Sequence, residues 1–138
     1  MQRKCNFVWH AERVARLLHP IAEEDLPVAK LAIWAILESK EGKEAEVEDF
    51  LKSAQPLAEQ EGETLTWYAV KIAPAKFAIF DTFAAESGRE AHLTGEIAKA
   101  LFAKAKELFA KDPEIHKVEV LASKAHLLTS RKRKAAHN

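Results

Sequence analysis

Cysteine is almost absent from this sequence, which contains only Cys5 among its 138 residues. A single thiol cannot form an internal disulfide or supply a four-thiolate metal site. We therefore expect a reducing, cytoplasmic setting and a fold stabilised by its apolar core. Glycine and proline are also scarce, at four and five residues, which excludes a fibrous or low-complexity chain.

The sequence also has no excess of positive or negative charge, because 21 basic residues balance 21 acidic ones. A neutral molecule has no net field that would attract nucleic acid or an anionic membrane. No stretch approaches the roughly 18 apolar residues that span a bilayer, and charged residues interrupt the N-terminal segment where a secretory signal would lie. We expect neither nucleic acid nor a membrane as a partner.

The residues that are present predict one folded domain between two extensions. Apolar residues make up 48% of the chain, enough for a core in a single domain. Net charge divides the chain into residues 1–26 at zero, 27–124 at −4 and 125–138 at +4. We expect an N-terminal extension, a folded domain and a basic, mobile tail over these ranges. The basic run 131–134 could be a nuclear localisation signal or contact a polyanion. A run of only four residues is more often part of a solvated chain end.

The N-terminal extension contains a short amphipathic pattern. Phe7, Val14 and Leu18 would lie on one face of a helix. Such a helix could pack on the main domain, contact a membrane surface through Arg13 and Arg16, or remain undocked. Two arginines are few for interfacial binding, so docking or fraying is favoured over a membrane contact.

Hydrophobic periodicity in residues 27–124 predicts alternating strands and helices. The expected elements are a strand over 28–37, a helix between 41 and 62, a hairpin of strands over 64–72 and 77–83, a long helix over 87–110 and a strand over 117–122. Gly95 weakens the long helix locally and could split it into a short and a long piece. The order βαββαβ is that of the ferredoxin-like α+β fold, a four-stranded antiparallel sheet with two helices on one face.

The expected strands are apolar on both faces, although the helices cover only one. Large apolar side chains available for the bare face are Trp34, Ile36, Trp67, Phe77, Ile79 and Phe83. The simplest cover is a second copy of the chain, packed sheet to sheet over an interface on the order of 2,000 Å² or more. We therefore expect a homodimer.

Four segments carry a resemblance to a known family. These are Glu41-Gly-Lys after the first strand, the run from Glu61-Gly to Trp67-Tyr, the strand Phe77-Ala-Ile-Phe-Asp-Thr-Phe, and Glu90-Ala-His92-Leu at the second helix. From Pro27 to Ser123 the sequence resembles the antibiotic biosynthesis monooxygenase family of the dimeric α+β barrel superfamily. Phe83 stands where the family usually has a tryptophan, while His92 matches the family's cavity-facing histidine.

The resemblance implies a cofactor-independent monooxygenase that oxidises a small aromatic phenol or quinol with O₂ in a pocket of a homodimeric barrel. No metal or flavin is implied. The alternative is a non-catalytic, small-ligand-binding or stress-associated dimeric barrel. Haem-degrading relatives combine the helix histidine with an asparagine on the first strand, where this chain has none. The six histidines never pair at i, i+4, so the sequence predicts no metal site.

His92 is the candidate catalytic residue, because an imidazole titrates near neutral pH and can accept a phenolic proton. The alternative is a partly exposed or hydrogen-bonded histidine with no role in catalysis.

The candidate substrate-binding residues are Trp67, Tyr68, Asp81 and Phe83. Trp67 could stack on a flat substrate, although strand aromatics more often build a core or an interface, and alternation places Tyr68 on the opposite face. Asp81 could be a buried acid with a raised pKa. We favour its pairing with a lysine such as Lys71 or Lys76.

Overall fold

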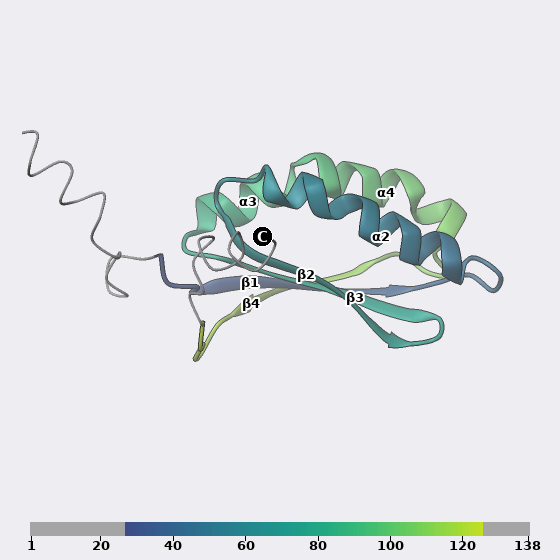
Figure 1. Ribbon diagram of the computed structural model, residues 1–138, viewed down its shortest axis with the longest axis horizontal. Helices are drawn as coiled ribbons and strands as arrows, with labels where there is room; N and C mark the ends of the chain where they lie inside the picture. Colours follow the sequence, from purple (N-terminus) through teal and green to yellow (C-terminus); the bar gives the residue numbers. More distant parts are fainter. Residues whose placement is uncertain (1–26, 126–138) are drawn as a thin grey trace, which may run out of the picture.

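The computed structural model describes residues 27–125 of the chain and confirms the ferredoxin-like α+β fold (Figure 1). Its elements are β1 (Leu31–Glu38), α2 (Glu44–Glu59), β2 (Thr64–Ala73), β3 (Lys76–Phe83), α3 (Glu86–Leu93), α4 (Glu96–Leu108) and β4 (Glu114–Glu119). The expected N-terminal helix and most of the basic tail lie outside the described residues.

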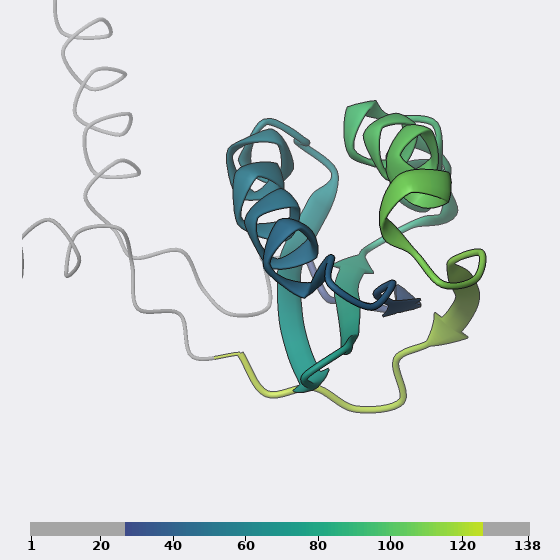
Figure 2. The same cartoon turned by 90° about the vertical axis from the view of Figure 1, so that its right-hand side faces the viewer.

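The four strands form one sheet in the order β2-β3-β1-β4, with every neighbouring pair antiparallel. Figure 2 shows the helices together on one side of this sheet, with the opposite side uncovered. β1 and β3 occupy the centre because both faces of each are apolar and need cover. The edge strands are β2 and β4, whose residues are more exposed.

Helix α2 covers the sheet through a regular apolar stripe. Val47, Leu51, Ala54 and Ala58 are buried and recur at intervals of three and four residues. Gly42, in the turn before the helix, has a φ of 85°, a conformation that residues with a Cβ rarely adopt. This turn brings the chain back from the end of β1 to run over the sheet.

The expected long helix is two helices, α3 and α4, with a break at Thr94 and Gly95. Gly95 has an extended backbone and is the N-cap of α4. The glycine that weakens the helical pattern therefore marks the boundary between the two helices. The break gives α3 its own direction and places it against β1, β2 and β3. His92, near the end of α3, is thereby directed into the interior.

The main core fills the space between the helices and the sheet. Its largest side chains include Ile33 and Leu37 from β1, and Phe77 and Phe83 from β3. Leu101 and Leu108 of α4 and Val47 and Leu51 of α2 close it from the helix layer. Of the side chains expected to be available for the bare face, Trp67, Phe77, Ile79 and Phe83 therefore belong to the helix-covered face.

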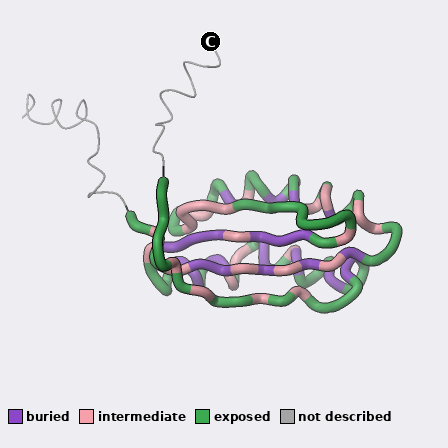
Figure 3. The backbone as a smooth tube through the Cα atoms, turned by 90° about the horizontal axis from the view of Figure 1, so that it is seen from below, coloured by how far each residue is buried: buried purple, intermediate pink, exposed green. Residues whose placement is uncertain are grey.

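The uncovered face is nevertheless aromatic. Trp34 of β1 lies directly opposite Phe80 of β3, their ring centroids 6.1 Å apart in an edge-to-face arrangement. Tyr68 of β2 pairs with the other side of Phe80 and is 56% exposed. Viewed from this side, the two central strands are largely buried and the outer strands largely exposed (Figure 3).

The last strand begins three residues earlier than the sequence pattern predicts, at Glu114 rather than residue 117. Pairing with β1 decides its position, because Glu114 lies opposite Ile36 and Glu119 opposite Leu31. Beyond β4 the chain crosses the uncovered face near the start of β1 (Figures 2 and 3). Leu121, which we expected inside the strand, is 94% exposed.

The close packing of α3 on the turn before β2 gives a test of the fold. A Cβ added at Gly88 would lie 3.0 Å from both Cβ and O of Glu63. We expect Gly88→Ala to lower the free energy of unfolding by about 1–3 kcal/mol, because the backbone must shift. The matched control is Gly62→Ala, where a Cβ would meet no atom within 4 Å. Equal effects of the two substitutions in urea denaturation would contradict this packing.

Candidate functional site

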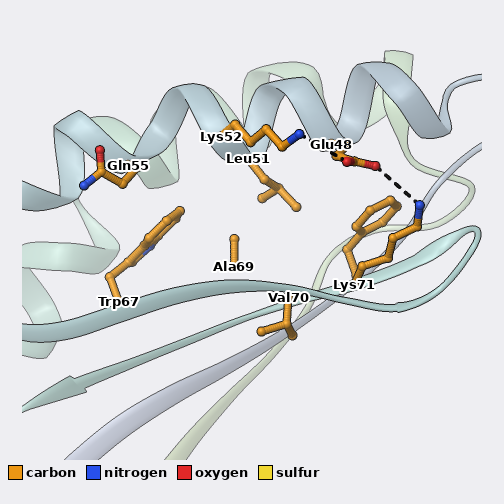
Figure 4. Close-up of a pocket in the computed structure, with 9 residues that line it drawn as sticks. Glu48, Leu51, Lys52, Gln55, Trp67, Ala69, Val70 and Lys71 are labelled. Atoms are coloured by element: carbon orange, nitrogen blue, oxygen red, sulfur yellow. Dashed lines mark hydrogen bonds and ion pairs between the residues drawn. The ribbon is translucent and has the colours of Figure 1, made fainter.

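A groove of about 470 Å³ lies between α2 and the edge strand β2 (Figure 4). Its walls are Glu48, Leu51, Lys52 and Gln55 of α2, Trp67, Ala69, Val70 and Lys71 of β2, and Phe77 of β3. The groove exists because β2 is an edge strand and carries only a small side chain, Ala69, below Leu51. A pocket of this size accommodates a small organic molecule.

The groove has an apolar interior with an indole at one end. Trp67 points up from β2 towards α2 and Gln55, whereas Val70 points to the other side of the strand (Figure 4). Trp67 also packs against the small cluster of Ala54, Ala58 and Ile97. The tryptophan that the sequence marks for substrate binding therefore forms part of a groove wall, and its ring is fixed by the helix layer.

The other end of the groove is charged. Glu48 lies 3.2 Å from Nζ of Lys52 and 3.4 Å from Nζ of Lys71. Hydrogen bonds from Lys52 and Lys71 lower the pKa of Glu48, so its carboxylate stays ionised at neutral pH. The Lys71 ammonium is also 5.9 Å from the centre of the Phe77 ring.

A second cluster, deeper in the molecule, joins three titratable side chains. Nδ1 of His92 lies 2.7 Å from Oε1 of Glu61, and Nε2 lies 2.8 Å from Oδ2 of Asp81. The side chain of Asp81 is fully buried and that of His92 is 8% exposed. The turn after α2, strand β3 and helix α3 each supply one member, so the cluster ties these three elements together.

The expected pairing of Asp81 with a lysine is wrong. Lys71 contacts Glu48 at the mouth of the groove, and Lys76 lies at the other end of β3, opposite Glu38. Asp81 instead points into the core, where a lysine would have to bury its ammonium. The imidazole of His92 is the smaller and less costly partner for a buried carboxylate.

The contacts of His92 limit its chemistry. Burial disfavours the imidazolium, but the hydrogen bonds and charges of Asp81 and Glu61 outweigh burial and raise the pKa of His92. Both ring nitrogens face carboxylates. His92 can accept a substrate proton only after one of these contacts opens, and its role as a base remains a prediction.

The structure brings together four of the five residues that the sequence singled out. Phe83 packs on His92 with ring centroids 5.5 Å apart, and Trp67 lies directly across the strands from Asp81 on the helix-covered face. Tyr68 is separated from them, because it lies on the uncovered face. His92, Asp81 and Phe83 are not among the residues that line the groove.

Sequence reasoning missed the polar residues of the groove and the second carboxylate on His92. Glu48, Lys52 and Gln55 recur at intervals of four and three residues, a signal that they share one side of α2. Lys71 shares the face of Trp67 by alternation along β2. Glu61 carried no signal, since its contact with His92 joins positions 31 residues apart.

Two further features concern residues 27–125 alone. None of the helices there combines the length and the apolar character that crossing a membrane requires. Within the same range, His, Cys, Asp and Glu side chains form no group of three that could hold a metal ion.

The sheet order, the helices on one face and the groove beside α2 define a ferredoxin-type α+β protein of the antibiotic biosynthesis monooxygenase-like fold. The chain belongs to the family of the NE2512 protein of unknown function from Nitrosomonas europaea. That protein is 50% identical, with a TM-score of 0.71, and the match covers 73% of this chain and 98% of that one.

Two more distant structures share the fold, each described as a “putative antibiotic biosynthesis monooxygenase”. The one from Nitrosomonas europaea is 10% identical, with a TM-score of 0.61 and coverage of 67% of this chain and 91% of that one. The one from Chloroflexus aurantiacus is 14% identical, with a TM-score of 0.56 and coverage of 70% and 98%. The fold that the sequence resemblance implied is thus confirmed. No protein-family model matches the chain, and neither does any curated protein.

The buried cluster predicts a pH dependence of stability. The folded-state pKa of His92 is raised, so its stabilisation is complete below the ordinary histidine pKa of about 6.5 and is lost as pH rises through the folded value. We expect His92→Ala to lower the free energy of unfolding by about 3 kcal/mol below pH 6.5, and by less at higher pH.

Urea denaturation between pH 6 and 9 measures this difference. The control is His116→Ala, because the His116 side chain is 49% exposed and pairs with the half-exposed Glu114, so it should contribute little. A difference for His92→Ala that stays constant or grows with rising pH would contradict the assignment.

Proposed function

We propose that the protein binds a flat aromatic hydroxyl compound, a phenol or quinol, in the groove between α2 and β2 and oxidises it with O₂ without metal or flavin. The groove itself carries this proposal, because it joins an apolar interior, an indole wall and a charged mouth. The names of the two distant structures that share the fold support the same reaction class.

The dimensions and lining of the groove suit such a ligand. A volume of about 470 Å³ falls within the range of small-molecule sites, roughly 300–1,000 Å³. An aromatic ring can lie between Leu51 and Ala69 with its edge or face against Trp67, a contact favoured by stacking and by removal of apolar surface from water. The polar end of the ligand then meets Glu48, Lys52 and Lys71.

The proposed reaction needs no reductant. A phenolate transfers one electron to O₂, the two radicals recombine at a ring carbon, and loss of water leaves a quinone. The balance is one phenol and one O₂ giving one quinone and one water: the C–H carbon becomes a carbonyl and the phenolic oxygen a second one. The protein has only to bind the ring, favour its anion and exclude competing solvent chemistry.

In this proposal the cluster of Glu61, His92 and Asp81 supports the groove from behind. Asp81 of β3 is the cross-strand neighbour of Trp67 of β2. The ion pair of Asp81 with His92 therefore fixes β3 at the point where it pairs with Trp67. His92 stays a candidate base through the family resemblance.

The alternative function is ligand binding without turnover. Both nitrogens of His92 are occupied, and His92 does not line the groove, which favours a protein that holds an apolar ligand and leaves it unchanged.

Oxygen uptake with a panel of hydroquinones and anthrols separates the two functions. We expect uptake by the native chain and at least a tenfold loss in Ala69→Leu, because the added side chain fills the groove. The matched control is Ala103→Leu, an exposed alanine on α4 outside the groove.

Equal uptake by the native chain and Ala69→Leu would exclude the groove as the site. Stoichiometric ligand binding with no uptake would favour the alternative function. Equal oxygen uptake by His92→Ala and the native chain would exclude a role for His92 in the reaction.

We also propose that a second copy covers the uncovered sheet face. Trp34, Ile36 and Phe80 are only half-buried there, and Tyr68 and Val70 are exposed, an apolar surface larger than single scattered residues.

Light scattering should give a mass near twice 15.5 kDa. Ile36→Lys should yield aggregated or unfolded protein, because it places a charge in the centre of this face, whereas Ala103→Lys should leave the mass unchanged. A well-behaved native monomer would refute the proposed dimer.

A further inference from the structure

The charged mouth of the groove combines side chains from two elements. Lys52 projects from α2 and Lys71 from β2, and both converge on Glu48 (Figure 4). These are the only charged residues among those that line the groove in the described part of the chain. One carboxylate faces two ammonium groups, so the mouth carries one positive charge that is not balanced locally.

This charge lies at a fixed distance from the indole end. Lys71 follows Trp67 by four residues on the same strand and face, which separates their Cα atoms by about 13 Å. Leu51, Ala69 and Phe77 line the interval and are apolar. The groove therefore offers an aromatic surface at one end and a cationic group at the other, complementary to a fused aromatic ring with an oxyanion at one edge.

We propose that Lys71, assisted by Lys52, binds the phenolate oxygen of the ligand and shifts the bound phenol towards its anion. This inference rests on the proposed function, since it assumes that a phenol occupies the groove. An opposite charge within about 4–6 Å stabilises an ionised group, typically lowering an acid's pKa by 1–3 units. Each unit raises the phenolate fraction tenfold at a pH below the phenol's pKa, which is about 10 for an ordinary phenol.

The assignment explains how the substrate could ionise without a free side-chain base. The phenolic proton passes to water at the exposed mouth, and the oxyanion remains beside the ammonium group. The electron-rich ring is then the species that reduces O₂. Neither nitrogen of His92 has to leave its carboxylate for this step.

The experiment uses 2-naphthol as the probe, because its absorbance distinguishes the phenol from the phenolate. Titration of the bound probe on the full chain should give a pKa at least one unit below that of free 2-naphthol. In Lys71→Met at least half of this shift should disappear. Glu48→Gln should enlarge the shift, because it removes the anion that competes for both lysines.

The matched control is Lys104→Met, since Lys104 is an exposed lysine on α4 that pairs with Glu107 across a similar distance. It should behave like the native chain. A second probe, 2-methylnaphthalene, has the same shape as 2-naphthol without the hydroxyl group and measures binding of the ring alone.

The outcomes separate this inference from the proposed function. If both probes bind, Ala69→Leu blocks both, and the pKa of bound 2-naphthol is unchanged or raised, the groove stands and the oxyanion site is refuted. The same shift in Lys71→Met and the native chain would also refute it. If neither probe binds the native chain, the proposed function fails together with the inference.

Discussion

A carboxylate without exposed surface sits in the apolar core of this protein, and much of the architecture follows from the need to balance its charge. Asp81 lies in the middle of the sheet, under the helix layer, where an unpaired charge would be very costly. The break at Gly95 lets α3 end over the sheet and bring His92 to this carboxylate. Glu61 then fixes the other side of the imidazole, which ties the turn after α2 to α3. A local electrostatic requirement thus sets the relative positions of three segments.

The titratable side chains of this cluster differ in burial from those at the mouth of the groove. On the inner side of Trp67, Asp81 and His92 are buried, Glu61 is largely buried, and the three groups contact one another. In front of the indole, Glu48, Lys52 and Lys71 are exposed at the mouth of a groove and carry net positive charge. Buried groups are suited to holding a geometry, whereas partly solvated lysines can exchange one partner for another at little cost. This difference is the physical reason for assigning ligand ionisation to the mouth and support to the interior.

The sheet itself presents two different apolar surfaces. One is filled by helices and carries the groove at its β2 edge, and the other ends in the row of Tyr68, Phe80 and Trp34. Because α2 runs above β2 and β2 pairs with a strand, β3, on one side only, the groove opens at an edge of the sheet and needs no cavity in the centre of the core. A partner on the uncovered face would bury the aromatic row without occupying the groove.

Local periodicity was enough to predict the fold class, the order of strands and helices apart from the break at Gly95, and which side chains share a strand face. It also placed Trp67 and Tyr68 on opposite faces. The start of β4 at Glu114 could not be predicted locally, since pairing with β1 sets the register of this strand. The pairing of Asp81 with a histidine and of Lys71 with Glu48 depends on how α2 and α3 pack across the sheet. Short-range sequence patterns contain no information about that packing, so these contacts could be seen only in the folded chain.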